Sequence, residues 1–267
     1  MTGKTARKHC ENLARVCAKI VEEGGCDLLF ACEVGGFRQG FKEAKIDVRH
    51  VLKEPFGDSV QHAEIDNYLA VWGFGGASQP AQVSLHGCAE RYTVPIGRDV
   101  DAAITRFDVV KSGIGKCHVV VGNMHIVCSK SQHRTIATKQ RAVRLLRDHL
   151  DGYVCEPDIP VVRIMVGDNN LVSQHVREAL QRETDTHPLW EVHAAKADFK
   201  GDHVAVSGAA ARFRSIAVGE SFKDRGMRHD CHNAVAVVIT SQSLRHARSI
   251  RAILTIVRAW HREQHVF

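Results

Sequence analysis

The chain has 267 residues, enough to bury a core without disulfides or a structural metal, and this length fits one large domain or two small ones. Its 44% hydrophobic and 25% charged residues are typical of a soluble globular protein, and no apolar run reaches the ~18 residues of a membrane span. The net charge of +6 favours anionic partners such as nucleic acid, phosphate esters or acidic lipid headgroups. A mildly basic surface without a partner explains the charge equally well.

The nine cysteines argue against a secreted, disulfide-bonded protein, because their number is odd and no two stand in a CxxC arrangement. Most of them lie inside apolar patterns, which predicts reduced and buried thiols. We therefore expect an intracellular protein, either cytoplasmic or nuclear. The cysteines within apolar patterns are Cys10, Cys17, Cys26, Cys32, Cys117 and Cys128.

A helix followed by a short buried strand is predicted at the beginning of the chain. Apolar residues recur at helical spacing over residues 13–21, and Gly24 ends this pattern. The stretch CDLLFACEV (26–34) is then typical of a buried strand, and it delivers Glu33 at its carboxyl end. Residues 41–66 are mixed and polar, and their pattern supports no assignment.

Five strands are predicted next, separated by Gly, Pro and Ser residues. The last of these, CHVVVGNMHIVC, delivers Asn123 and His125 near its end. The predicted strands cover residues 68–74, 81–87, 91–96, 104–110 and 117–128.

Helices and strands alternate in the second half of the chain. Residues 135–150 form an amphipathic pattern that turns its leucines inward and Arg147 elsewhere. Ser173 is the predicted N-cap of the following helix, and a basic amphipathic helix is predicted from about Ser243 to Gln264. Further strands are predicted at 159–168, 189–195, 202–208 and 233–240.

This mixture of elements predicts an α+β fold of layered sheets covered by helices, rather than one parallel sheet. One domain is expected over residues 1–240, and the amphipathic helix within 241–267 is expected to pack on it.

Four of the predicted strands deliver polar residues that suit metal binding or acid–base chemistry. These residues are Glu33, then Asn123 with His125, then Asp168 with Asn170, and then the cluster from Asp230 to Asn233. Hard divalent cations prefer oxygen ligands, and hydrolysis of phosphates needs a base and hydrogen-bond donors. Each delivery alone has a plainer explanation, such as a turn at GDNN. Their order and context carry the inference.

The set resembles the endonuclease/exonuclease/phosphatase superfamily, which includes deoxyribonuclease I, from about Cys26 to Thr240. That resemblance implies a four-layer α/β/β/α sandwich of two mixed sheets. It also implies the residue roles. CEV is similar to the family's QEV, and this similarity implies that Glu33 is a metal ligand. GNMH is similar to the family's NxH, which implies that Asn123 contacts the substrate and that His125 is catalytic. GDNN is similar to the family's GDFN, which implies that Asp168 and Asn170 orient the nucleophile and the phosphate. DCHNAV is similar to the family's SDHxPV, which implies that His232 is the catalytic histidine. Asp202 would orient that histidine.

Two departures from the family pattern bear on activity. The family's usual first strand, which carries an Asn near the metal, is not recognised, because the sequence pattern begins with the helix that would follow it. Two explanations stay open: the strand is absent, or the sequence is a fragment of a longer product. The family's Asp immediately before the histidine is Cys231 here. Asp230 stands one residue earlier, and a strand would turn it to the opposite face unless a bulge intervened.

The resemblance implies a phosphodiesterase dependent on Mg²⁺, with Mn²⁺ as the other candidate, and nucleic acid as its partner. Glu33 and Asp230 would bind the metal, and Arg212 and Arg228 would contact phosphates, although a solvated surface explains any single arginine better. Two alternatives stay open. One is a phosphatase acting on a lipid, an inositol phosphate or another phosphorylated small molecule. The other is a catalytically impaired module that binds nucleic acid or serves as a scaffold.

Overall fold

The computed structural model describes most of the chain between residues 27 and 254. The described residues are 27–32, 52–54, 56–66, 68–74, 81–96, 100–111, 115–126, 135–154, 156, 158–181, 190–194, 201–207, 211–217, 235–241 and 249–254. For residues 111, 115, 202, 211–217, 235–241 and 249–254 the description is limited to the backbone.

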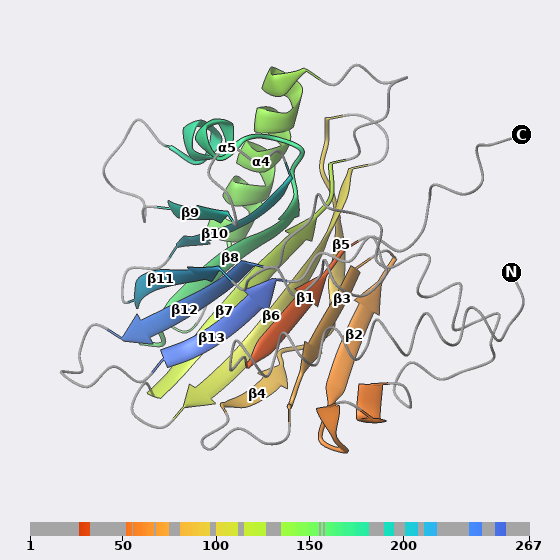
Figure 1. Ribbon diagram of the computed structural model, residues 1–267, viewed down its shortest axis with the longest axis vertical. Coiled ribbons are helices and arrows are strands. Elements are labelled where there is room, and N and C mark those ends of the chain that lie inside the picture. The colour runs from red at the N-terminus through yellow and green to blue at the C-terminus, as the bar shows by residue number, and fades with distance from the viewer. Residues whose placement is uncertain are drawn as a thin grey trace, which may run out of the picture.

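The fold consists of two mixed β-sheets packed face to face (Figure 1). Within the described ranges the first sheet has six strands, and β1 and β13 are its parallel pair. In sheet order these strands are β11 (Ala211–Ala217), β12 (Val235–Ser241), β13 (Ser249–Leu254), β1 (Leu28–Ala31), β3 (Tyr68–Trp72) and β2 (Gln61–Ile65).

The second sheet contains the strands that end at the candidate site. Its parallel pair, β7 and β8, is joined through helix α4 (Ile136–Asp151), and α5 (Ser173–Leu180) follows β8. In sheet order the strands are β4 (Gln82–Leu85), β6 (Asp101–Lys111), β7 (Gly115–Met124), β8 (Val161–Asp168), β10 (Asp202–Ser207) and β9 (Trp190–Ala194), with β5 (Glu90–Thr93) beside β6.

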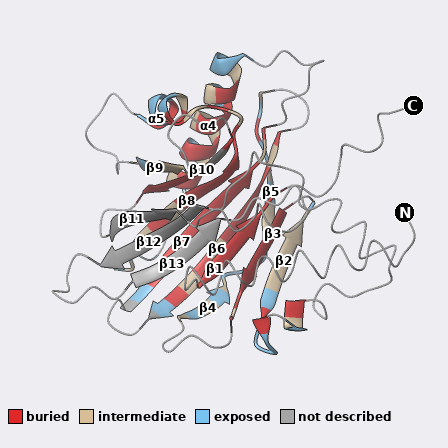
Figure 2. Ribbon diagram, viewed as in Figure 1, coloured by how far each residue is buried: buried red, intermediate tan, exposed pale blue. Residues whose placement is uncertain are grey.

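The central strands of the second sheet are buried on both faces because the first sheet covers one and the helices cover the other (Figure 2). Strand β6 illustrates how the period of two serves both layers. Ala103 and Phe107 enter the core between the sheets, whereas Ala102 and Ile104 face the core beneath α4. This double burial explains the continuous apolar runs of the central strands.

The α+β sandwich of two mixed sheets predicted from the sequence is confirmed. The predicted helix at 135–150 corresponds to α4. Arg147, which was predicted to point away from the core, is buried, and its guanidinium donates to the carbonyl groups of Ala179 and Gln181. The N-cap of α5 is Val172 rather than Ser173, whose hydroxyl instead contacts His203. None of the described helices is long and apolar enough to cross a membrane.

The prediction of a helix from Ser243 to Gln264 is wrong for Ser249–Leu254, which forms β13. This strand lies between β12 and β1 and pairs with both, so the first sheet extends beyond residue 241. Hydrogen bonding on both sides outweighs the local helical periodicity. Strands β2 and β11 were not predicted either, and the predicted helix at 13–21 lies outside the described residues.

Two of the six cysteines predicted as buried thiols, Cys32 and Cys117, are buried and form no disulfide with another described residue, and the other four lie outside the described residues. Burial raises the pKa of the Cys117 thiol to about 11. Cys88 is free and exposed.

Candidate functional site

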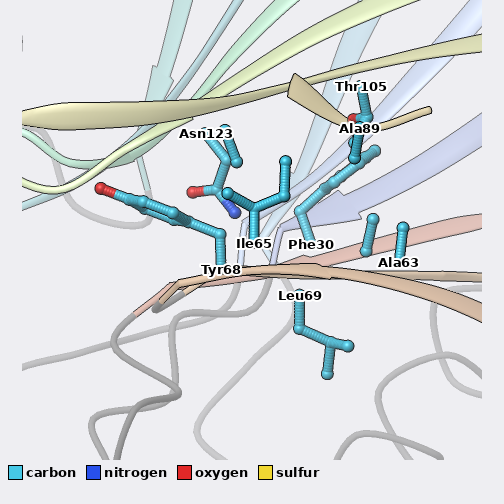
Figure 3. A pocket seen from close by; sticks show the side chains of 10 residues that line it. Phe30, Ala63, Ile65, Tyr68, Leu69, Ala89, Thr105 and Asn123 are labelled. Atoms are coloured by element: carbon cyan, nitrogen blue, oxygen red, sulfur yellow. The ribbon is translucent and has the colours of Figure 1, made fainter. Parts of the chain in front are cut away.

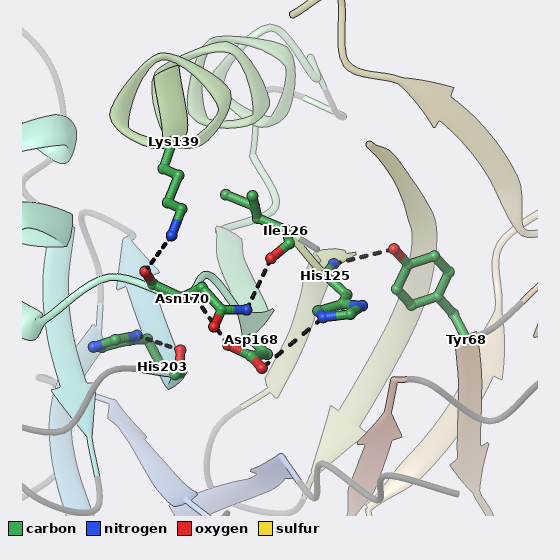
Figure 4. A network of polar contacts seen from close by, with 8 residues as sticks. Tyr68, His125, Ile126, Lys139, Asp168, Asn170 and His203 are labelled. Atoms are coloured by element: carbon green, nitrogen blue, oxygen red, sulfur yellow. Dashed lines mark hydrogen bonds and ion pairs between the residues drawn. The ribbon is translucent and has the colours of Figure 1, made fainter. Parts of the chain in front are cut away.

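Neighbouring parallel strands bring His125 and Asp168 together at one edge of the second sheet. Asn123 of β7 is paired with Val166 of β8, so β7 and β8 end side by side. His125 follows β7 and Asp168 closes β8, and the His125 Nε2 atom lies 3.9 Å from the Asp168 Oδ2 atom (Figure 4). A buried carboxylate therefore stands behind an imidazole that is 13% exposed.

Gly167 allows β8 to approach the end of β7 closely enough for this contact. Its φ angle is +141°, and a Cβ atom at this position would lie 1.8 Å from the carbonyl oxygen of Met124. Only glycine tolerates both the conformation and the approach. The adjoining backbone is fixed as well, since the Ile126 N–H donates to the Asp168 carbonyl at 2.9 Å.

Asn170 is held in a left-handed backbone conformation immediately after this strand, with φ of +49°. Its N–H donates to the Asp168 Oδ1 atom at 2.9 Å, which is an Asx turn. Its side-chain Nδ2 donates to the Ile126 carbonyl at 2.8 Å (Figure 4). The sequence GDNN is therefore a turn, and the same turn fixes the orientation of Asp168 and Asn170.

Strand β10 supports the turn from the other side. The register places Asp202 directly opposite Asp168, and the Gly201 carbonyl accepts the Asn169 N–H at 3.0 Å. The His203 Nδ1 also contacts this carbonyl at 2.8 Å, and its Nε2 lies 3.2 Å from the Ser173 hydroxyl. Burial lowers the pKa of His203 to about 4, so its ring is neutral at pH 7.

Two hydrogen bonds tie the end of β7 to the first sheet. The Asn123 Nδ2 donates to the Ala31 carbonyl of β1 at 2.9 Å, two residues before Glu33 in the sequence. The His125 N–H donates to the Tyr68 hydroxyl of β3 at 3.1 Å, and that hydroxyl donates to the Asp101 carbonyl at 2.6 Å. Burial raises the pKa of Tyr68 far above its ordinary value, so the hydroxyl keeps its proton.

A small pocket opens between the sheets beside these groups, with room for about one water molecule (Figure 3). Tyr68 and Asn123 provide polar atoms in a lining that is otherwise mostly apolar. The buried Oδ1 atom of Asn123 accepts no hydrogen bond from any residue that the structure describes.

The chemistry of the described residues fits a hard cation in part. The Asp168 carboxylate and the side-chain carbonyl of Asn123 have oxygen atoms of the kind that Mg²⁺ prefers as ligands. No group of three or more His, Cys, Asp or Glu side chains that could hold a metal occurs within the described ranges. The two residues predicted as metal ligands, Glu33 and Asp230, lie outside those ranges.

The remaining predicted residues are placed only in part. Asp202 and Arg212 have described backbones, with Arg212 opposite Thr240 on the pair of β11 and β12. His232 and Arg228 lie outside the described residues.

Three residues that contact the site were not predicted from the sequence: Tyr68, Lys139 and His203. Each acts through a partner distant in the chain or through a backbone carbonyl, so no local motif indicates its role.

Comparison with known proteins places the chain near several solved structures of low identity. No protein-family model matches it, and no curated protein sequence matches it significantly. Truncated TDP2 of Caenorhabditis elegans is similar with a TM-score of 0.49 at 12% identity, over 79% of this chain and 82% of that one. The catalytic domain of human Nocturnin, solved with a bound sulfate anion, has a TM-score of 0.44 at 13% identity, over 75% and 77%.

An endonuclease/exonuclease/phosphatase family protein of Bacteroides thetaiotaomicron is similar with a TM-score of 0.42 at 11% identity, over 73% of this chain and 72% of that one. At such identities these similarities concern the course of the backbone and assign no residue a role. The solved structures that this chain is similar to thus include members of the superfamily predicted from its motifs.

Proposed function

We propose that the chain is a metal-dependent phosphodiester hydrolase that acts on nucleic acid as an endonuclease. The observation that supports this most directly is the contact between His125 and Asp168, which stands beside the Asn170 turn at the ends of two parallel strands. A partly exposed imidazole backed by a buried carboxylate is suited to proton transfer.

The geometry suggests a distinct task for each described residue. Asp168 orients the His125 ring, which would serve near the leaving oxygen. One Nδ2 hydrogen of Asn170 is used by Ile126, which leaves its Oδ1 as an acceptor and a second hydrogen for the reacting groups. Because this amide carries no charge, it can orient water or phosphate without repelling an anionic substrate.

Activation of the attacking water is assigned to His232, with Asp202 orienting its ring. The His232 imidazole would take a proton from the water while the water oxygen forms a bond to phosphorus. One P–O ester bond would break, and the departing oxygen would gain a proton. The position of Asp202 opposite Asp168 supports this role, because it brings the β10 backbone to the same strand ends.

Glu33 and Asp230 would hold the ion, Mg²⁺ or Mn²⁺, whose chemistry when bound is to withdraw charge from a phosphate oxygen. The hydrogen bond from Asn123 to Ala31 supports this assignment of Glu33, because it ties the chain two residues before Glu33 to the end of β7. The buried Oδ1 atom of Asn123, which has no hydrogen-bond partner among the described residues, adds an oxygen donor nearby.

Nucleic acid is the proposed substrate because the net charge of +6 favours a polyanion. Arg212 and Arg228 are the candidate phosphate contacts. Binding through such contacts weakens steeply as salt rises.

The test is cleavage of supercoiled plasmid and of a short RNA by purified protein, with Mg²⁺, Mn²⁺ or EDTA, beside His232→Ala and His125→Ala. Cleavage that needs the metal and is lost in both variants is the expected result. Retention of DNA in a gel shift without cleavage would favour the impaired binding module. If the protein neither cleaves nor binds nucleic acid, phospholipid and inositol phosphate substrates become the better candidates.

A further inference from the structure

Lys139 is buried next to the candidate site, although nothing in its helix requires a lysine there. It is the fourth residue of α4, and the residue is only 7% exposed. Lysine is almost never buried to this extent unless its ammonium has a partner. The Lys139 Nζ atom reaches down from α4 and donates to the Asn170 carbonyl at 3.0 Å (Figure 4).

The placement of this charge is unfavourable for the helix itself. The first turn of an α-helix carries the positive end of the helix dipole, where acidic residues stabilise and basic residues do not. The first turn of α4 has no acidic residue to compensate. Helix stability therefore does not explain Lys139, and its partner Asn170 is the place to look for its role.

Lys139 completes a set of contacts that hold Asn170 from three sides. The Asn170 N–H is bound by the Asp168 carboxylate, its side chain by the Ile126 carbonyl, and its own carbonyl by Lys139. Asparagine adopts a positive φ angle more readily than other non-glycine residues, but this conformation is still a minor one, and the three contacts favour it here.

The ammonium also adds a fixed positive charge directly behind Asn170. In a poorly solvated position a charge acts over several ångströms with less screening than at the surface. The substrate proposed above is an anion, and its charge would increase as the phosphate is attacked.

We propose that Lys139 is a positioning residue that keeps Asn170 in its left-handed conformation and adds positive charge behind the scissile phosphate. The first half of this proposal concerns the protein without substrate, and the second half rests on the proposed function. A purely structural role, tying α4 to the loop after β8, predicts a loss of stability without a selective effect on turnover.

The test compares Lys139→Met, Lys139→Arg and the control Arg141→Met, an exposed position on the same helix. Two readouts are taken from folded protein. One is the NMR signal of the Asn170 side-chain amide, assigned with Asn170→Asp. The other is kcat and KM for metal-dependent hydrolysis of the p-nitrophenyl ester of thymidine 5′-monophosphate.

Lys139→Met is expected to shift the Asn170 amide signal and to lower kcat about 10- to 100-fold, as loss of a supporting contact does, with KM changed less than about threefold. Lys139→Arg keeps the charge and should recover part of the loss, and Arg141→Met should match the wild type. If Lys139→Met does not fold, Lys139→Gln replaces it, with the same expectations for the signal and for kcat.

The proposal is overturned if the neutral variant leaves the Asn170 signal in place and keeps kcat within twofold of Arg141→Met. A wild-type protein that hydrolyses no phosphodiester would contradict the proposed function and the assignment of the charge. The Asn170 signal would still decide whether Lys139 holds the turn.

Discussion

The His125 Nε2 atom lies 3.9 Å from the Asp168 Oδ2 atom, and Asp168 is only 1% exposed. The carboxylate is fixed from below, because one of its oxygens accepts the Asn170 N–H. The imidazole is the more exposed of the two partners, with 13% of its side-chain surface accessible. This asymmetry suits a proton-transfer pair better than a surface ion pair, in which both partners are mobile.

Asp168→Asn is expected to lower kcat/KM for phosphodiester hydrolysis by about 10²- to 10⁴-fold, because the neutral amide no longer orients or stabilises the protonated His125 ring. The matched control is Glu191→Gln, which changes another histidine–carboxylate pair, with 3.8 Å between His193 Nε2 and Glu191 Oε2. Steady-state kinetics on both variants check this. A loss below tenfold in Asp168→Asn would exclude a catalytic role for the pair.

Tyr68→Phe should loosen the connection between the two sheets at the site. The change removes the hydroxyl that accepts the His125 N–H and donates to the Asp101 carbonyl, without altering the ring. Leaving these buried groups unpaired should reduce the free energy of unfolding by about 1 to 3 kcal/mol, measured by urea denaturation.

Tyr153→Phe is the control for Tyr68→Phe. Among the described residues, the contacts of the Tyr153 hydroxyl are long, 3.4 Å to His149 and 3.5 Å to Glu90, so its removal should cost less than about 1 kcal/mol. Equal losses in the two phenylalanine variants would mean that the Tyr68 contacts contribute little.

The two strand ends that carry His125 and Asp168 were predictable because their signals are local. The apolar run before Asp168 and the turn chemistry of Asn170 lie within one short segment, and the structure brings them to the predicted strand end. The structure likewise places His125 at the end of β7, where the sequence pattern put it.

The parts that could not be predicted depend on partners distant in the chain. Lys139 lies on a helix with a regular amphipathic pattern, and its contact with a carbonyl 31 residues away cannot be predicted from that pattern. The segment Ser249–Leu254 has helical periodicity, but it forms a strand because it pairs with both β1 and β12. The role of Tyr68 requires knowing that β3 faces the end of β7.

His203 should make the protein less stable as the pH falls from about 6.5 to 4. Burial lowers the pKa of the folded-state ring to about 4, whereas the ordinary value is 6.5. Between these values the unfolded chain binds a proton that the folded protein does not, so protons favour unfolding. The expected contribution is about 1.4 kcal/mol for each pH unit in this window.

The comparison of wild type with His203→Gln isolates this contribution from that of the other histidines. Urea denaturation at several pH values should show a gap between the two proteins that narrows as the pH falls, because the variant has no imidazole to titrate. A gap that stays constant from pH 6.5 to 4 would show that His203 is not buried as a neutral ring.

Gly167→Ala should be among the most destabilising small substitutions in the chain. The φ angle of +141° is unfavourable for alanine, and the added Cβ would lie 1.8 Å from the Met124 carbonyl oxygen, so β7 and β8 would have to separate.

Gly57→Ala is the control that separates backbone strain from the steric clash, since Gly57 has φ of +86° with nothing within 4 Å of a Cβ. The control should lose about 1 kcal/mol from backbone strain alone. Gly167→Ala should lose at least about 3 kcal/mol in urea denaturation, and it should also disrupt the contact between His125 and Asp168. Similar losses in both variants would mean that the strand ends can separate at little cost, and that Gly167 does not determine the spacing at the site.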